Sequence, residues 1–375
     1  METLEVDILI VGAGPAGTSA ARSAAACGAR VAILERRAVV GVPVQCAEYI
    51  PAPLLAAVNT GRRFVIQSIR GMKTFLNGEC IQEILAPGYT IARDIFDGAL
   101  ADAARETGAA LHLATSALTR QDGDVIAKRR DGKISRVRAE VIIGADGPHS
   151  RVARWIDSPN RALIPAVQVK MRLSRPMEFT EVYFDSEIYG GYGWLFPRGD
   201  TANVGLGMKR RRGVDPGLPR SLGQLVSRLL RYGKVEGDPF DFTAGWIPAE
   251  SPKNIVRGNV LLAGDAAGHT HPITGAGLPQ AVAGGRMAGT WAARAVESGN
   301  AGVLSGYEEE WSDLYGTALD LGFQRRCLLE REWETLDRVI RRCWVTFKEY
   351  YQPPRPAGAT DEAAATACSS CASPH

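Results

Sequence analysis

The sequence predicts an α/β protein in which a parallel, Rossmann-like sheet carries an inserted antiparallel sheet and is followed by a helical C-terminus. Two observations favour this fold class. Three buried strand patterns each end in a glycine turn, at Gly12, Gly144 and Gly264. Between the second and third turns, short aromatic or β-branched segments alternate with Gly, Pro and Asp, which is typical of antiparallel strands. We therefore expect a ligand site where the parallel strands end.

The composition of the chain excludes several classes of protein. The 375 residues are 45% hydrophobic and carry a formal net charge of +3, so two domains are expected and a nucleic-acid partner is not. The sequence has no apolar run near the roughly 18 residues of a membrane span, and its N-terminus is too acidic for a signal peptide. The seven cysteines are scattered, unlike a secreted disulfide framework. These features predict a cytoplasmic protein.

The first elements form a predicted βαβ unit. Residues 4–11 (LEVDILIV) are expected to be a buried strand, the alanine-rich residues 16–27 a helix and residues 30–34 a second strand. Gly28 is placed to end the helix. This order brings the first glycine turn to the edge of the sheet where a ligand is expected.

The later segments extend both sheets and add helices. Parallel strands are expected at residues 139–143 and 259–263, and antiparallel strands at 163–173, 180–184, 188–197 and 201–208, with a hairpin turn at 198–201. Helices are expected at residues 278–298, 305–332 and 333–351. The domain assignment is a discontinuous cofactor-binding domain (1–50, 90–160 and 255–300), a substrate domain (51–89 and 161–254), C-terminal helices (301–352) and a disordered tail (353–375).

The first glycine turn has the pattern of a dinucleotide site. Gly12, Gly14 and Gly17 form G-x-G-x-x-G between a strand and a helix, which lets the backbone and the helix N-terminus approach a pyrophosphate. Glu35 ends the next predicted strand, where a carboxylate can accept ribose hydroxyls. In contrast, Cys368, Cys371 and His375 in the tail supply one ligand too few for a closed zinc site, so no metal is predicted.

The other two turns resemble those of FAD enzymes with the p-hydroxybenzoate-hydroxylase-like fold. The stretches are GADGPHSR at residues 144–151 and GDAAGHTHPITGAG at residues 264–277. The resemblance implies that Asp265 binds the ribitol chain of FAD and that residues of the same turn surround the isoalloxazine ring. The further cofactor-binding residues that it implies are Arg93, Asp146, Gly264, Pro272, Gly275 and Gly277. For Asp146 and Arg93, a turn residue and a surface arginine are the alternatives.

A further motif resembles the geranylgeranyl reductase family of flavoproteins. Residues 192–207 read YGWLFPRGDTANVGLG, a Y-x-W-x-F-P segment followed after seven residues by G-x-G. Alternation along a strand places Tyr192, Trp194 and Phe196 on one face, either as a substrate-binding wall or as core. Cys46, in GVPVQCAEY, resembles a cysteine that this family holds near the flavin. Ala276 departs from the family, which often has Glu there.

The resemblance implies an FAD-dependent reductase that saturates a carbon–carbon double bond of an apolar, isoprenoid substrate. Cys46 and His271 are the candidate catalytic residues, as donors of a proton to the alkene. The alternatives are gating of the ring or a packing role for Cys46, and a structural hydrogen-bonding role for His271. Since the sequence has one dinucleotide fingerprint, NAD(P)H is expected to bind transiently, or another electron donor replaces it. The alternatives are an FAD-dependent monooxygenase acting on an aromatic ring or a peptide tryptophan, and a flavin-binding accessory protein without turnover.

The last predicted helix carries an apolar stripe. Its members are Leu336, Val339, Ile340, Cys343, Trp344, Phe347 and Tyr350, and arginines occupy the other faces. Packing against the body of the protein is the default expectation. The alternative is contact with a bilayer, which would place the protein at the inner face of the membrane, where isoprenoid lipids are found.

Overall fold

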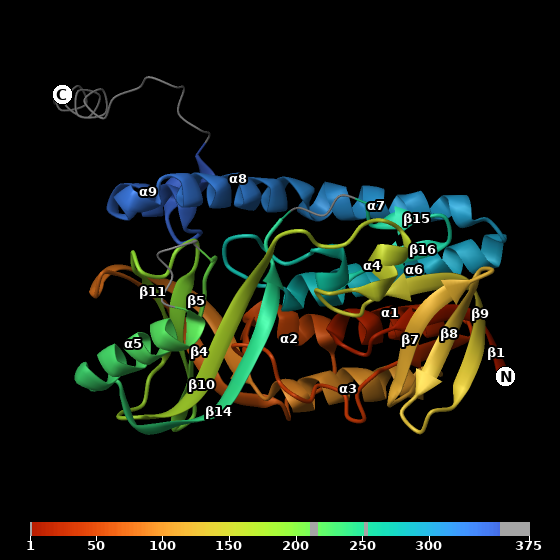
Figure 1. Cartoon of the computed structure of the whole chain (residues 1–375), viewed down its shortest axis with the longest axis horizontal. Helices are drawn as coiled ribbons and strands as arrows, with labels where there is room; N and C mark the ends of the chain where they lie inside the picture. The colour runs from red at the N-terminus through yellow and green to blue at the C-terminus, as the bar shows by residue number, and fades with distance from the viewer. Residues whose placement is uncertain (1, 211–216, 251–253, 353–375) are drawn as a thin grey trace, which may run out of the picture.

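Two large sheets organise the computed structural model, which describes residues 2–210, 217–250 and 254–352 (Figure 1). The first sheet has eight strands with the order β15-β16-β9-β1-β2-β6, and a β7–β8 hairpin joins it through β9. Its strands are β1 (Glu2–Val11), β2 (Val31–Leu34), β6 (Ala110–His112), β7 (Thr115–Gln121), β8 (Asp124–Arg129), β9 (Ile134–Gly144), β15 (Val256–Arg257) and β16 (Val260–Leu262). The central pairs, β1 with β2 and β1 with β9, are parallel. The predicted fold class is confirmed.

The helices of the first sheet pack closely because the residues at their contacts are small. The helices here are α1 (Pro15–Ala26), α3 (Arg93–Glu106), α4 (Arg151–Trp155) and α6 (Leu278–Ser298). A Cβ atom on Gly285 or Gly289 of α6 would lie 2.2 Å from the carbonyl oxygen of Ala16 or Ala20 in α1. Glycine is therefore required at both positions, and the two helices hold the first glycine turn against the sheet.

The second sheet also has eight strands, in the order β14-β10-β13-β12-β11-β4-β5-β3. They are β3 (Tyr49–Pro51), β4 (Val65–Leu76), β5 (Glu79–Ile91), β10 (Leu163–Leu173), β11 (Phe179–Phe184), β12 (Tyr192–Arg198), β13 (Thr201–Gly207) and β14 (Val235–Pro248). The sheet is antiparallel as predicted, except that β11 pairs with β4 in parallel. This pair joins the two chain segments that build the sheet. The strand expected at residues 188–197 begins only at Tyr192, after a turn at Gly190 with φ of +64°.

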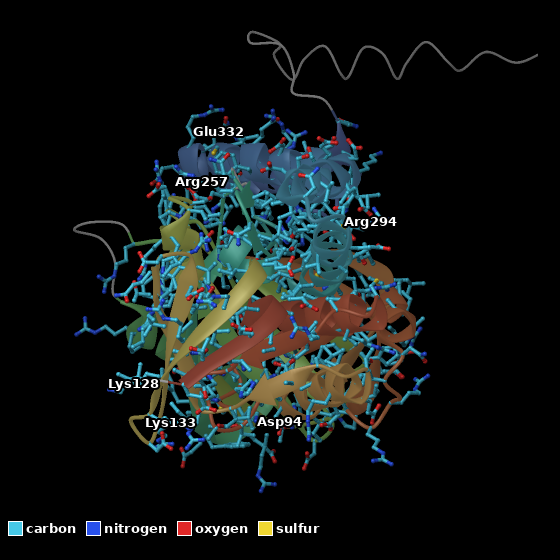
Figure 2. All side chains as sticks on the ribbon, turned by 90° about the vertical axis from the view of Figure 1, so that its right-hand side faces the viewer. Asp94, Lys128, Lys133, Arg257, Arg294 and Glu332 are labelled. Carbon is cyan, nitrogen blue, oxygen red and sulfur yellow. The ribbon has the colours of Figure 1, made fainter. Side chains whose placement is uncertain are left out.

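Different helices pack on the two faces of the second sheet. Helix α5 (Leu218–Arg231) packs its apolar side on one face, and α2 (Ala52–Val58) lies at the β3–β5 end. The C-terminal helices cover the other face and form a row along one long side of the molecule (Figure 1). Charged side chains such as Lys128, Arg257 and Arg294 point outward into solvent (Figure 2).

The C-terminal segment is helical but more interrupted than predicted. Its elements are α7 (Ser305–Trp311), a π-helical turn (Ser312–Gly316), α8 (Thr317–Arg331), a 3₁₀ turn (Trp333–Thr335), α9 (Leu336–Cys343) and a 3₁₀ turn (Lys348–Tyr351). The predicted helix 333–351 is thus wrong as one element. Helix α6, in contrast, spans the predicted residues 278–298.

The apolar stripe of the C-terminal segment is part of the core. All seven of its members are buried, from Leu336 to Tyr350. This confirms the default expectation, and the stripe is not available to a bilayer. Within the described ranges, no helix is long and apolar enough to cross a membrane. The predicted disordered tail with Cys368, Cys371 and His375 lies outside the described residues.

Trp344 anchors the stripe and gives a test of this packing. Its side chain is 1% exposed, and its indole N–H donates to Thr74 Oγ1 at 3.1 Å. We expect Trp344→Ala to lower the free energy of unfolding by about 3–5 kcal/mol, because it leaves a large cavity in the core. Denaturant titration measures this change. The control is Tyr351→Ala, which removes an aromatic ring that is 65% exposed and should change stability by less than about 0.5 kcal/mol. Equal midpoints for the two variants would contradict the buried position of Trp344.

Candidate cofactor and substrate site

The first glycine turn combines two close contacts with one open position. A Cβ atom on Gly12, whose φ is +103°, would lie 2.3 Å from the carbonyl oxygen of Ala145, and one on Gly17 would lie 1.9 Å from that of Gly12. A Cβ atom on Gly14 would meet nothing within 4 Å. Gly12 and Gly17 are therefore required by the fold itself, whereas Gly14 leaves space at the N-terminus of α1. A pyrophosphate fits such a space.

Glu35 closes this turn from the end of β2. Its Oε2 accepts the N–H of Ala13 and its Oε1 accepts the N–H of Arg37, both at 2.8 Å. Each carboxylate oxygen has a further lone pair. The position suits a ribose, as the sequence predicts, although part of the hydrogen-bonding capacity of Glu35 serves the turn.

The two predicted aspartates differ in how the chain uses them. Asp146 accepts the hydroxyl of Ser150 and the N–H of Arg151, so its carboxylate caps α4. Asp265, in a 3₁₀ turn (Gly264–Ala267), accepts the Thr270 hydroxyl on Oδ1 at 2.8 Å. Its Oδ2 has no hydrogen-bond partner among the described residues. Burial raises the pKa of both carboxyls. Asp265 is therefore the better placed of the two to accept a ribitol hydroxyl.

Side chains from two other elements donate hydrogen bonds to the turn that is expected beside the isoalloxazine ring. Arg326, a buried arginine of α8, donates to the carbonyl oxygen of Pro272 at 2.9 Å, and the Tyr192 hydroxyl donates to that of Thr274. Gly275 has φ of +66° and lies against Ile247 of β14, and Gly277 precedes α6. Both the second sheet and the C-terminal helices thus fix the position of this turn.

His271 is neutral and bound within the protein. Its Nδ1 accepts the N–H groups of Ile273 and Thr274 at 3.3 Å each, and its Nε2 lies 3.3 Å from the hydroxyl of Tyr350. Burial lowers its pKa to about 4. His269 stacks on Trp311 with ring centroids 3.5 Å apart, and burial lowers its pKa to about 3. The proton-donor role of His271 stays a prediction, and the contacts of this ring are those of a residue that holds a turn.

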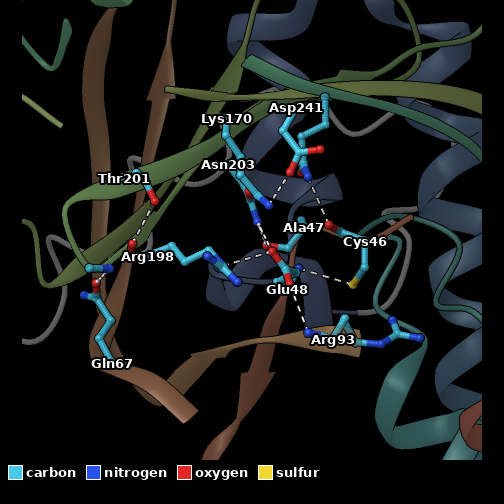
Figure 3. A network of polar contacts seen from close by, with 12 residues as sticks. Cys46, Ala47, Glu48, Gln67, Arg93, Lys170, Arg198, Thr201, Asn203 and Asp241 are labelled. Atoms are coloured by element: carbon cyan, nitrogen blue, oxygen red, sulfur yellow. Dashed lines mark hydrogen bonds and ion pairs between the residues drawn. The ribbon is translucent and has the colours of Figure 1, made fainter. Parts of the chain in front are cut away.

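Cys46 belongs to a polar network that centres on Glu48 (Figure 3). Its Sγ accepts the N–H of Glu48 at 3.2 Å, and its carbonyl oxygen accepts Gln168 Nε2 at 3.1 Å. Gln168 in turn accepts the indole N–H of Trp194 at 2.9 Å. A continuous chain of hydrogen bonds therefore joins the Cys46 loop to the predicted substrate-binding wall.

Arg93 links Cys46 to the cofactor turns. Its guanidinium donates to both oxygens of Asp97, at 2.9 and 3.0 Å, and interacts electrostatically with Cys46 and with Asp265. Burial opposes the charge of Arg93, but Asp97 and Cys46 raise its pKa above the ordinary value. Burial raises the pKa of Asp97 and exceeds the opposing effect of Arg93. The structure thus places Arg93 where it interacts with Cys46 on one side and with Asp265 on the other, although the three residues are far apart in the sequence.

Tyr192, Trp194 and Phe196 share one face of β12, as the alternation predicts. Trp194 and Phe196 are each 7% exposed. Tyr192 packs against Trp344 with ring centroids 5.2 Å apart, and Phe196 packs against Tyr49 at 6.0 Å. The wall is therefore largely covered by the protein's own side chains.

Two residues of this site, Gln168 and Glu48, are not among those that the sequence predicts. Gln168 is buried, but in LIPAVQVKMRL it alternates in step with Lys170 and Arg172, so the strand pattern predicts a solvent-facing polar position and gives no signal. Glu48 follows Cys46 by two residues, but its partners lie far along the chain, so no local pattern identifies it.

Comparison with known families assigns the two nucleotide-binding regions. The FAD binding domain family matches residues 88–320, and the NAD(P)-binding Rossmann-like domain family matches residues 10–68, which include the glycine turn. FAD is therefore the cofactor, with a nucleotide as electron donor. The open position at Gly14 and the free Oδ2 of Asp265 fit this cofactor.

Comparison with individual proteins finds reductases of isoprenoid lipids. The chain is 34% identical over 84% of its length to digeranylgeranylglycerophospholipid reductase from Methanothrix thermoacetophila, 84% of which is covered. It is 33% identical over 89% of its length to the protein of the same name from Methanosarcina acetivorans, with 87% of that protein covered. Both relatives match nearly the whole of the described fold.

Solved structures give the same fold. A geranylgeranyl bacteriochlorophyll reductase-like protein from Thermoplasma acidophilum aligns with a TM-score of 0.79 at 25% identity, covering 92% of each chain. A probable FAD-dependent monooxygenase from Pseudomonas aeruginosa, pqsL, aligns with a TM-score of 0.66 at 21% identity, over 90% of this chain and 99% of its own. The second likeness concerns the fold alone.

The open position at Gly14 predicts a variant that folds without its cofactor. We expect Gly14→Val to keep the wild-type melting temperature of the apoprotein and to purify with little FAD, because the side chain fills space that the fold leaves free. Gly223→Val is a matched control, since a Cβ atom there also meets nothing within 4 Å.

Asp265→Ala should weaken FAD binding by about 1–3 kcal/mol through loss of a buried acceptor. Flavin-to-protein absorbance ratios report all three. Full flavin content in Gly14→Val and Asp265→Ala would overturn the site.

The two buried histidines predict a loss of stability in mild acid. The folded pKa values of His269 and His271, about 3 and 4, lie below the ordinary value of 6.5. Between the folded pKa values and 6.5, the unfolded chain therefore binds more protons than the folded chain. The histidines contribute their whole stabilisation above pH 6.5, and the free energy of unfolding falls as the pH drops from 6.5 toward 4. Thermal melts between about pH 7 and 5 should show this slope. His271→Gln should make the slope shallower, and an unchanged slope would contradict the neutral state of His271.

Proposed function

The chain belongs to the geranylgeranyl reductase family of FAD-dependent oxidoreductases, and we propose that it saturates carbon–carbon double bonds of a phospholipid that carries geranylgeranyl chains. The relatives named digeranylgeranylglycerophospholipid reductase support this substrate class. One feature of the site carries the proposal. Hydrogen bonds join Cys46 through Glu48 to Arg93 at the start of α3, and through Gln168 to Trp194 of the apolar wall.

The cofactor is assigned to residues that converge at the carboxyl edge of the first sheet. Gly12, Gly14, Gly17 and Glu35 would hold its adenosine diphosphate half, and Asp265 its ribitol chain. Gly264, Pro272, Gly275 and Gly277 would lie beside the ring, with Arg93 and the Asp146 turn nearby. When bound and reduced, FAD supplies the hydride for alkene reduction.

The protein's own residues orient the substrate and deliver a proton. Tyr192, Trp194 and Phe196, which the protein's own side chains largely cover, form the proposed apolar wall for an isoprenoid chain, from which water is excluded. Cys46 is the proposed proton donor, from its Sγ to the alkene carbon that does not receive the hydride. His271 is a weaker candidate because both ring nitrogens already have partners. One hydride and one proton add across each double bond.

The same observations bear on the electron donor and the alternatives. NAD(P)H is proposed to bind transiently, since the sequence holds one dinucleotide fingerprint, at Gly12–Gly17.

Because the proposed substrate is a lipid, the protein is proposed to work from the cytoplasm at the inner surface of a membrane. The monooxygenase alternative rests on fold likeness at 21% identity, whereas the sequence relatives at 33–34% are reductases.

Cys46→Ser tests the proton donor. Serine keeps the volume nearly constant, so folding and FAD content should match the wild type. We expect alkene reduction to slow by at least about tenfold, or about 1.4 kcal/mol in the barrier, because a hydroxyl is a much weaker acid than a thiol. Flavin reduction should change far less, since it requires no proton at the substrate.

Stopped-flow measurement of both half-reactions, with lipid in detergent, separates the two steps. Cys27→Ser, at the exposed end of α1, is the matched control and should behave as the wild type. Equal alkene-reduction rates for Cys46→Ser and wild type would leave Cys46 a packing residue.

A further inference from the structure

Glu48 is a buried carboxylate in an unusual backbone conformation. Its side chain is almost wholly enclosed, since the residue is 1% exposed. Its φ of 66° lies in the left-handed region, which favours glycine. A charged residue in such a place is retained only where specific contacts compensate for the lost hydration.

The contacts of Glu48 reach three separate parts of the site (Figure 3). Its own N–H donates to the Sγ of Cys46 at 3.2 Å. Its Oε1 accepts the N–H of Arg93 at 3.0 Å, and its Oε2 accepts Asn203 Nδ2, also at 3.0 Å. Arg198 Nε lies 3.2 Å from Oε2 as an ion pair, without the alignment of a hydrogen bond.

The bond to Arg93 makes Glu48 the cap of α3. The residue before this helix is Ala92, which has no side chain that can accept from the first N–H groups. Glu48 supplies the missing acceptor from 45 residues away, and its negative charge is favourable at a helix N-terminus. The helix therefore starts at a fixed place, and its first residue presents its guanidinium to Cys46 and Asp97.

The bonds to Asn203 and Arg198 attach the same carboxylate to the substrate wall. Asn203 of β13 pairs directly with Phe196 of β12, and Arg198 ends β12. Asn203 Nδ2 also donates to the carbonyl oxygen of Ala47 at 3.1 Å. Glu48 thus connects the wall strand, the Cys46 loop and α3 through one side chain.

We propose that Glu48 is a positioning residue of the reductase, which holds the Cys46 thiol in place beside Arg93 and in register with the aromatic wall. The proposal rests on the proposed function for the role of Cys46 as proton donor. The partners of the Glu48 carboxylate are all donors, so both of its oxygens must accept. A glutamine cannot satisfy them, because its NH₂ group would face either the N–H of Arg93 or the Asn203 amide.

Glu48→Gln in the FAD-loaded protein is the first test. We expect alkene reduction to fall by at least about tenfold while flavin reduction stays within about twofold, because the glutamine oxygen can still accept the N–H of Arg93 and cap α3, whereas the bond from Asn203 is lost. Alkylation of Cys46 by iodoacetamide, followed by peptide mass spectrometry, should become faster as the loop loosens.

Glu181→Gln is the matched control. Glu181 is 4% exposed, lies on the α5 side of the same sheet and accepts from Tyr183 and Lys234. This control variant also loses a buried carboxylate, so it reports the general cost of such a change. It should leave both half-reactions and the alkylation of Cys46 unchanged.

A second variant, Glu48→Gln with Asn203→Asp, exchanges the amide and the carboxylate across the same contact. It restores a negative charge opposite Arg198 but removes the donor to the Ala47 carbonyl oxygen, so it should recover part of the alkene rate and partly slow the alkylation again. This rescue would not be seen if Glu48 acted only through overall stability. It also supplies a testable protein if Glu48→Gln alone fails to retain FAD.

The outcomes separate the two proposals. Wild-type alkylation and a wild-type alkene rate in Glu48→Gln, with FAD retained, overturn the positioning role. If the wild type reduces no lipid alkene but Glu48→Gln still alters the alkylation of Cys46 and the exchange reverses it, the positioning role stands and the proposed function fails.

Discussion

The close approach of backbone segments at the carboxyl edge of the first sheet is the constraint on which the rest of the structure depends. The turn after β1 lies so near the turn after β9 that only glycine fits at position 12. The same lack of space recurs where α6 crosses α1 at Gly285 and Gly289. Because these contacts press α1 against its neighbours, the N-terminus of α1 is fixed in space with an open position at Gly14. A binding site for a pyrophosphate is thus a consequence of how the helices pack.

The loop from Gly41 to Glu48 transmits this arrangement to the second sheet. Gln45 donates to the carbonyl oxygen of Ala244 at 2.6 Å, and Thr243 donates to that of Val44 at 2.7 Å. These bonds hold the loop along the edge strand β14, and the bond from Gln168 holds it to β10. The loop is therefore attached to the second sheet at three places, and the Cys46 thiol lies where the proposed cofactor-binding and substrate-binding elements would meet.

A structural feature of this protein is predictable from the sequence when neighbouring residues determine it. It is not predictable when the determining residues lie far apart in the chain. The glycine turns and α6 follow from local patterns, so the fold class and the cofactor region were predictable. The interrupted C-terminal helix was not, because its apolar period persists through the breaks while tertiary contacts such as that of Trp344 with Thr74 decide where they fall. Glu48 and Gln168 were missed for a related reason. Their partners, Arg93, Asn203 and Trp194, are brought to them only by the completed fold.

The charges of the site are arranged so that an apolar substrate can be accepted. An isoprenoid chain offers no hydrogen bonds, so any charge it covers must already be compensated within the protein. Arg93 is paired with Asp97, and Glu48 is paired with Arg198. Buried pairs of this kind contribute little net stability, since desolvation offsets most of their attraction, and their value here lies in specificity. In the proposed mechanism, they would hold the Cys46 thiol in place while leaving the aromatic face of β12 apolar, so that a proton donor and an uncharged surface lie together.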